Sequence, residues 1–259
     1  MADSSKSIKD PQLLLGILGG LGPMAGVYFC EMLISHTLAT TDKDHINFLL
    51  SSRADTPDRS SYIIGESKDD PLPTMTEEAR RLEKAGADLI AIPCNTAHHF
   101  YEGISNAVKV PVVNIIEQTA LFCKFCGVQR IGLLATQGTA ASGAYEKHLE
   151  RYGIKVLALS EEEQSTVSAV IFDQIKAGLP PDVESLLKIA EALYSRGAEL
   201  VVLGCTELSL LKKNNRLPNY VIDSLELLAL CVISQMGKTP QNFDPELMKF
   251  YGSAGKDTD

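Results

Sequence analysis

The chain has 259 residues, of which 45% are hydrophobic and 22% charged, as expected for a globular protein with a core for one or two domains. Its formal net charge of -9, without a basic stripe, argues against nucleic acid or an anionic membrane as a partner. The six cysteines show neither a disulfide framework nor the spacing of a zinc site. We therefore expect a cytoplasmic protein without a metal ion, with Met1–Asp10 and Gly252–Asp259 loosely ordered.

Short apolar runs alternate with helical patterns along the chain, which is typical of parallel sheets with helices on both faces. The strands predicted for the first half are Leu13–Leu18, Ile46–Ser51, Leu89–Pro93 and Val110–Ile115. Those predicted for the second half are Arg130–Ala135, Lys155–Leu159, Leu200–Leu203 and Tyr220–Ile222. The uncharged stretch from Leu13 to Cys30 is broken by glycines and a proline, so it predicts a strand, a loop and a helix start rather than a membrane span.

One segment occurs twice, at Gly86–Cys94 and at Gly197–Cys205, with its glycine, acidic, apolar and cysteine positions in register. Each copy predicts a buried strand that places a thiol at its C-terminal end. Duplication then predicts an α/β fold of two pseudosymmetric, doubly wound parallel-sheet domains with an interdomain cleft. The helices after Ser224 have no strand of their own, so we expect them to pack back on the first half. The expected domains are residues 1–117 plus 220–259, and residues 118–219.

Ligands of open parallel sheets bind beyond the carboxyl ends of the strands, and the first segment placed there is Gly19–Ala25. Pro23 suits the first position of a helix, and the backbone N–H groups of a helix start suit an anion. The segment is also a degenerate form of the dinucleotide fingerprint, with Asp55 as the candidate acid. That alternative gives the two repeated cysteines no role.

Cys94 and Cys205 end the repeated strands, so a cleft between the halves can hold one thiol on either side of a bound molecule. This arrangement suits the transfer of a proton from one face of a carbon to the other. The polar residues that follow, Asn95-Thr96 and Thr206-Glu207, can cap a helix or hydrogen-bond a ligand. We expect a helix N-terminus to lower the pKa of each thiol. The alternative is that both are small buried residues that only pack.

Two further turns offer ligands for carboxylates. Asp55–Ser60 is a rigid turn that presents Arg59, whose guanidinium can bind a carboxylate in bidentate fashion; a surface pair with Asp58 is the alternative. In the second half, Thr136 and Thr139 provide hydroxyl groups for another carboxylate, although Thr139 also suits a helix cap. Both turns favour a substrate that carries carboxylate groups.

Five motifs together resemble the aspartate/glutamate racemase family, in particular its aspartate racemase branch. They are Gly-Gly-Leu-Gly-Pro at 19 to 23, Pro-Asp-Arg at 57 to 59, Cys-Asn-Thr-Ala-His at 94 to 98, Ala-Thr-x-Gly-Thr at 135 to 139 and Gly-Cys-Thr-Glu-Leu at 204 to 208. They follow the family's order over nearly the whole chain. The resemblance implies a homodimeric, PLP-independent amino-acid racemase that needs no cofactor, with its active site between two α/β domains.

The resemblance also implies roles for individual residues. Cys94 and Cys205 become the two catalytic acid/bases, and Arg59 holds a carboxylate of the substrate. The family places a lysine on the helix before the second cysteine strand, and Lys176 is the candidate. The roles of His98 and Glu207 stay open. The residues expected to bind the substrate at the second and third motifs are Arg59, Asn95, Thr96 and Ala97.

The resulting hypothesis is that one thiolate removes the α-proton of aspartate or glutamate while the opposite thiol protonates the other face. Donors from the Asn95-Thr96 and Thr206 turns stabilise the carbanion. Side-chain specificity is expected to depend on the cleft near Arg59, Lys176 and Met24. The alternatives are a related dicarboxylate isomerase or decarboxylase, a broad-specificity amino-acid racemase, and a non-enzymatic amino-acid sensor.

Overall fold

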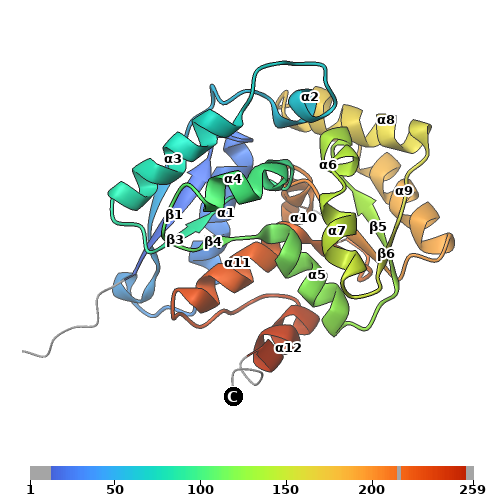
Figure 1. The fold of residues 1–259 in the computed structure, drawn as a ribbon. Coiled ribbons are helices and arrows are strands. Elements are labelled where there is room, and N and C mark those ends of the chain that lie inside the picture. Colours follow the sequence, from blue (N-terminus) through green and yellow to red (C-terminus); the bar gives the residue numbers. More distant parts are fainter. Residues whose placement is uncertain (1–12, 215–216, 255–259) are drawn as a thin grey trace, which may run out of the picture.

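The computed structural model describes residues 13–214 and 217–254 and contains two four-stranded parallel sheets (Figure 1). The strand order is β2-β1-β3-β4 in the first sheet and β6-β5-β7-β8 in the second. The same order in both halves is what a duplication produces, and the predicted α/β class with two parallel sheets is confirmed. The expectation for Met1–Asp10 lies outside the described residues, as does that for residues 255–259, whereas residues 252–254 end helix α12.

All eight predicted strands are present, several with shifted ends. β3 stops at Ala91 rather than at Pro93, because proline has no N–H to donate to a neighbouring strand. The strands of the first sheet are β1 (Leu14–Gly19), β2 (Asn47–Ser52), β3 (Leu89–Ala91) and β4 (Val112–Val113). Those of the second sheet are β5 (Arg130–Leu134), β6 (Lys155–Leu157), β7 (Leu200–Leu203) and β8 (Val221–Asp223).

Helices connect the strands and cover the sheets. Those up to β5 are α1 (Pro23–Ser35), α2 (Arg59–Ile63), α3 (Leu72–Lys84), α4 (Tyr101–Ser105) and α5 (Ile115–Phe125). The later ones are α6 (Gln137–Ala141), α7 (Ala144–Glu150), α8 (Glu161–Ala169), α9 (Val183–Ser195), α10 (Ser209–Asn214), α11 (Ser224–Gln235) and α12 (Pro245–Ala254). Among the described residues, no helix is long and apolar enough to cross a bilayer.

Equivalent caps start the helices that follow the last strand of each sheet. Asn114 accepts hydrogen bonds from the backbone N–H groups of Ile116 and Glu117 at the start of α5. Asp223 accepts one from the N–H of Leu225 at the start of α11. Asn and Asp are favoured at this position because their side-chain oxygens satisfy N–H groups that have no partner within the helix. The two helices therefore begin in the same way.

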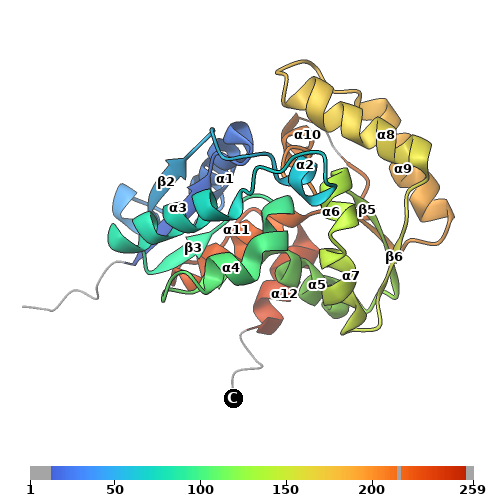
Figure 2. The same ribbon diagram turned by 45° about the horizontal axis from the view of Figure 1, so that its top comes forward.

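α5 and α11 form a central layer between the two sheets (Figures 1 and 2). They pack against each other, and α11 also packs against α1. One hydrophobic cluster runs from β1 and α1 through these helices to β5. The two halves thus share a continuous apolar core on this side. The polar edge where the strands end lies opposite, and α2 crosses from the first half to pack on α6 (Figure 2).

The domain boundaries proposed from the sequence stay a prediction. The pairing of β8 with β7 places Val221–Asp223 in the second sheet, although the predicted second domain ends at residue 219. The packing of α11 on α1 is consistent with helices that return to the first half.

Candidate active site

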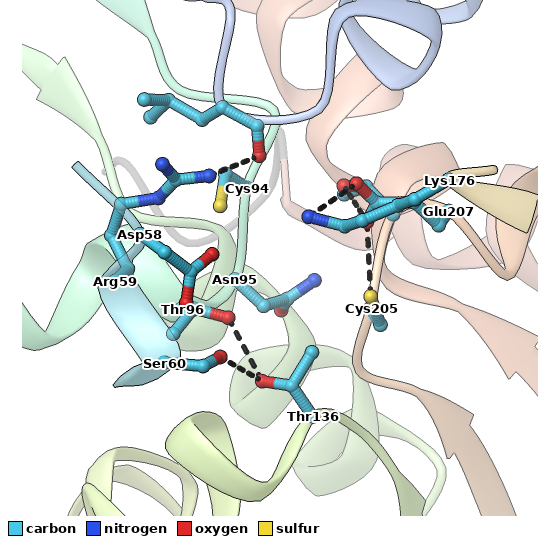
Figure 3. A pocket seen from close by; sticks show the side chains of 12 residues that line it. Asp58, Arg59, Ser60, Cys94, Asn95, Thr96, Thr136, Lys176, Cys205 and Glu207 are labelled. Carbon is cyan, nitrogen blue, oxygen red and sulfur yellow. Dashed lines mark hydrogen bonds and ion pairs between the residues drawn. The ribbon is translucent and has the colours of Figure 1, made fainter. Parts of the chain in front are cut away.

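A small cavity of about 10 Å³ lies at the carboxyl ends of the strands, where the two halves meet (Figure 3). Both repeated thiols line it, together with two cationic side chains, two carboxylates, five uncharged polar residues and one leucine. The lining residues are Leu21, Asp58, Arg59, Ser60, Cys94, Asn95, Thr96, Thr136, Lys176, Cys205, Thr206 and Glu207. This volume holds about one water molecule. An amino acid therefore enters only if the cleft opens or side chains move.

Cys94 is fixed by the turn that follows β3. The residue is 6% exposed, and the backbone N–H of Ala97 acts to lower the pKa of its thiol. His98 Nδ1 lies 2.8 Å from the carbonyl oxygen of Cys94, and His98 Nε2 accepts a hydrogen bond from the N–H of Ile115. The ring is therefore neutral, with its proton on Nδ1. Burial lowers its pKa to about 4. His98 is thus a buried structural residue whose two hydrogen bonds connect the backbone of Cys94 to the start of α5.

Cys205 is hydrogen-bonded to a carboxylate. Its Sγ donates to Glu207 Oε2 over 3.0 Å, and Glu207 Oε1 forms an ion pair with Lys176 Nζ at 3.4 Å (Figure 3). Glu207 is 5% exposed, and Thr206 Oγ1 lies 3.5 Å from the same Oε2. A thiol, a carboxylate and an ammonium group therefore form a short chain along one side of the cavity.

Gly22, in the turn after β1, makes room for this carboxylate. Its φ is 139°, a conformation that favours glycine, and a Cβ at this position would lie 2.1 Å from Glu207 Oε1. The glycine turn of the first half therefore fits closely around an acid of the second half.

Arg59 is buried rather than exposed, because three backbone carbonyls hold its guanidinium. Nη2 donates to the carbonyl of Leu21, and Nη1 donates to those of Thr56 and Pro57. The alternative of a surface pair with Asp58 is wrong, since Arg59 is 6% exposed and the Asp58 carboxylate instead caps α2. Among the described residues, Arg59 Nε has no hydrogen-bond partner. One edge of the guanidinium thus retains a donor.

Hydroxyl groups from both halves form a cluster on the opposite wall. Thr136 Oγ1 lies 3.1 Å from both Thr96 Oγ1 and Ser60 Oγ, and Thr139 Oγ1 lies 2.8 Å from Thr96 Oγ1. Thr136, not Thr139, caps α6, because it accepts from the N–H of Thr139. A Cβ at Gly138 would lie 2.5 Å from Ser60 Cα, so glycine permits the close contact between α2 and α6.

The Asn95 side chain is held on both sides. Tyr145 donates from its hydroxyl to Asn95 Oδ1 over 2.7 Å, and Asn95 Nδ2 donates to Ser224 Oγ over 3.0 Å. The two bonds fix which end of the amide carries the donor. One further N–H of Nδ2 remains for a ligand.

The expectation that the pKa of each thiol is lowered is wrong. Burial raises the pKa of Cys94, against an opposing effect of the Arg59 charge. Burial and then the Glu207 carboxylate raise the pKa of Cys205 well above its usual value. The helix dipole has little influence here, because a short 3₁₀ turn follows Cys94 and α10 begins only at Ser209.

A second cavity of about 360 Å³, the outer cavity, adjoins the first, which is the inner cavity. Asp58, Arg59, Lys176 and Glu207 line both cavities and form the wall between them. The outer cavity is otherwise lined by the Gly20–Ala25 turn and by apolar side chains that include Ile175, Leu210 and Met24, which is 63% exposed. Met24 therefore lies at the outer cavity and not beside the thiols.

Most of the predicted site residues line the inner cavity, but two lie behind it. Ala97 and Thr139 are fully buried supports of Cys94 and of the hydroxyl cluster. Lys176 comes from a different helix than expected. It follows the π-helical turn Val170–Ile175 at the end of α8, and α9 intervenes before β7. The prediction missed three lining residues, of which Leu21 and Asp58 lie inside the first two motifs and Ser60 directly follows the second.

Two duplicated α/β halves with a pair of thiols in the pocket between them are typical of a racemase. Known proteins with similar sequences and structures belong to the same class. A family model described as Asp/Glu/Hydantoin racemase matches residues 18–232. The chain belongs to this family. It is an enzyme, a PLP-independent racemase, which confirms that part of the prediction. Among the described residues, no group of three His, Cys, Asp or Glu side chains is placed to hold a metal ion.

Three relatives are similar over most of their length. The broad specificity amino-acid racemase RacX of Bacillus subtilis is 28% identical over 230 residues, which cover 85% of this chain and 97% of that protein. The structure of Picrophilus torridus aspartate racemase is 30% identical, with a TM-score of 0.77 over 92% of this chain and 99% of that one. An aspartate racemase homologue from Pyrococcus horikoshii is 27% identical, with a TM-score of 0.70 over 88% and 100%.

Proposed function

We propose that the enzyme interconverts L- and D-aspartate, or L- and D-glutamate. One of the thiols Cys94 and Cys205 removes the proton from Cα, and the other supplies a proton to the opposite face. The observation that carries the proposal is that both thiols line one cavity with Arg59 and Lys176 (Figure 3). Cations there suit a substrate with two carboxylates. The similarity to Picrophilus torridus aspartate racemase supports the choice of aspartate.

In the proposed reaction, the thiolate of one cysteine takes the α-proton, and the electron pair of the C–H bond stays on Cα and the α-carboxylate. The opposite thiol then gives its proton to the other face of Cα and becomes the thiolate. Hydrogen-bond donors at Asn95 and Thr96, and the backbone N–H groups of the turn at Thr206, whose hydroxyl already donates to the Pro93 carbonyl, stabilise the charge on the carboxylate. Closure of the cavity removes water and strengthens these interactions.

The experiment is racemisation in deuterium oxide without an added cofactor. We expect deuterium at Cα of the product, and we expect Cys94→Ala and Cys205→Ala each to lower the racemisation rate by at least about a hundredfold. Cys126→Ala is the matched control, because this thiol is exposed and lies outside the cavity. Wild-type racemisation in either active-site variant would refute the two-thiol mechanism.

A broader amino-acid specificity is the second candidate. The apolar part of the outer cavity, with Met24, Ile175 and Leu210, offers space for side chains other than those of aspartate and glutamate. The similarity to the broad specificity racemase RacX is consistent with this. A chiral assay across the common amino acids, extended to dicarboxylates, separates both candidates from a related isomerase or decarboxylase. We further propose a cytoplasmic homodimer, which ultracentrifugation and cell fractionation can test.

A further inference from the structure

The two thiols have equivalent positions in the repeats but different electrostatic surroundings. Cys205 Sγ and Glu207 Oε2 lie 3.0 Å apart, at hydrogen-bond distance. A carboxylate can only accept a hydrogen bond, so one of the two side chains must carry a proton that the other accepts. The ion pair of Glu207 Oε1 with Lys176 stabilises the charged carboxylate. Together these contacts place the shared proton on sulfur.

Cys94 has a different set of neighbours. The Arg59 guanidinium lies beside its sulfur in the cavity (Figure 3), whereas both thiols have a backbone N–H that lowers the pKa, that of Ala97 for Cys94 and that of Glu207 for Cys205. Among the described residues, no carboxylate is hydrogen-bonded to Cys94 Sγ. The Lys176 charge lowers the pKa of both thiols and the Glu207 charge raises both, but Arg59 lies beside Cys94 and the carboxylate is hydrogen-bonded to Cys205. A cation favours a thiolate, whereas an adjacent carboxylate disfavours one.

The position of Glu207 is built into both halves of the molecule. Thr206 is anchored to the first half through its bond to the carbonyl of Pro93. Gly22 leaves space for the carboxylate, which any larger residue there would fill. The contact to Cys205 is therefore not an incidental rotamer of an exposed acid.

We propose that Glu207 is a positioning residue that keeps a proton on Cys205 in the resting enzyme, so that the resting form is ready to deprotonate the enantiomer whose α-proton faces Cys94. This inference rests on the proposed two-thiol function. When Cys94 takes the α-proton, Cys205 releases its own proton to the other face of Cα. The product complex then holds a thiolate beside the Glu207 carboxylate. After the product leaves, that repulsion favours transfer of a proton from Cys94 to Cys205, which restores the resting form before the next turnover.

The experiment measures the alkylation of each thiol by iodoacetamide across a pH range, with the modified peptides quantified by mass spectrometry. The reagent is uncharged, so removal of a charge from the protein does not alter its approach. The midpoint of each rate profile reports ionisation, while access to the cavity affects only the amplitude. In the wild-type enzyme, we expect the midpoint of Cys205 to lie at least about one pH unit above that of Cys94.

Glu207→Gln keeps the size of the side chain and removes its charge. We expect it to lower the Cys205 midpoint by about one unit or more, and to move the Cys94 midpoint less. Glu226→Gln is the matched control, because Glu226 also pairs with a lysine, Lys212, but lies outside the cavity. It should leave both midpoints unchanged, and Glu207→Asp should restore part of the wild-type separation.

Two outcomes would overturn the proposal. One is a wild-type Cys205 midpoint at or below that of Cys94, which needs no variant to fold. The other is an unchanged Cys205 midpoint in a folded Glu207→Gln variant. Alkylation requires no turnover, so this result is independent of the deuterium experiment. The deuterium experiment therefore tests the two-thiol mechanism, and the alkylation experiment separately tests which thiol carries the proton.

Discussion

Thr206 Oγ1 donates a hydrogen bond of 3.0 Å to the carbonyl oxygen of Pro93. This bond joins the turn that carries Cys205 to the strand end that carries Cys94, so a side chain of one half holds the backbone of the other. Thr206 is 1% exposed, and the bond is therefore shielded from water. The relative position of the two thiols depends on it.

Thr206→Val should weaken this connection without changing the shape of the side chain. Loss of the donor leaves the buried Pro93 carbonyl unpaired, which costs about 1 to 3 kcal/mol in the free energy of unfolding. We expect a higher KM and a lower kcat, because the closed arrangement of the thiols becomes less stable. Thr206→Ser is the control, since it keeps the hydroxyl. Equal kinetics in the two variants would contradict the role of the hydrogen bond.

Gly22→Ala should damage the site through Glu207. The new Cβ would lie 2.1 Å from Glu207 Oε1, and a φ of 139° is unfavourable for alanine. We expect the ion pair with Lys176 to be displaced and kcat/KM to fall at least about tenfold, or about 1.4 kcal/mol in transition-state free energy. Gly26→Ala tests the specificity of the effect, because a Cβ there meets only an ordinary contact of 3.7 Å. Comparable losses in both variants would show that the helix, and not Glu207, is responsible.

The sequence contained enough information for the sheets and for the two thiols. Gly86–Cys94 and Gly197–Cys205 repeat in register, and equal segments fold into equal strands, so the eight strands and the position of both cysteines follow. The caps at Asn114 and Asp223 are also visible as a short repeat. These features depend on neighbours along the chain.

Features that depend on contacts between distant segments were not predictable in the same way. Lys176 reaches the cavity from a π-helical turn two helices away from β7, which no local pattern specifies. The thiol pKa values rise because burial outweighs the helix dipole, and burial is a property of the packed halves. Arg59 is bound by carbonyls of its own turn and of Leu21, and only this contact with the distant Leu21 decides between a buried guanidinium and the alternative surface pair with Asp58.

His98 should make the protein less stable in acid. Its pKa is about 4 in the folded state, from 6.5, because burial disfavours the charged ring. The unfolded chain therefore binds more protons between these values, so stability falls as pH decreases from about 6.5 towards 4, by roughly 3 kcal/mol for this group. Asp223 titrates with the opposite sign over nearly the same range, so we expect the His98 slope in the difference between the urea-unfolding free energies of wild type and His98→Gln. His98→Gln, which has no titrating group, should be less stable at pH 7 and should lose much of the slope; an unchanged slope would contradict the assignment.

Asp223 should have the opposite effect over an overlapping pH range. It is 1% exposed, and burial followed by the charge of Glu226 raises its pKa to about 7, from 3.8. The folded state therefore binds more protons between these values, so this group's contribution to stability falls as pH rises through that range. Asp223→Asn keeps an oxygen for the N–H of Leu225, as Asn114 does in the equivalent cap, and removes the charge. The quantity measured is the free energy of unfolding in urea of Asp223→Asn minus that of wild type. We expect this difference to be roughly 1 to 3 kcal/mol more favourable to the variant at pH 8 than at pH 5. If the two proteins differ by the same amount at both pH values, Asp223 is not the titrating group.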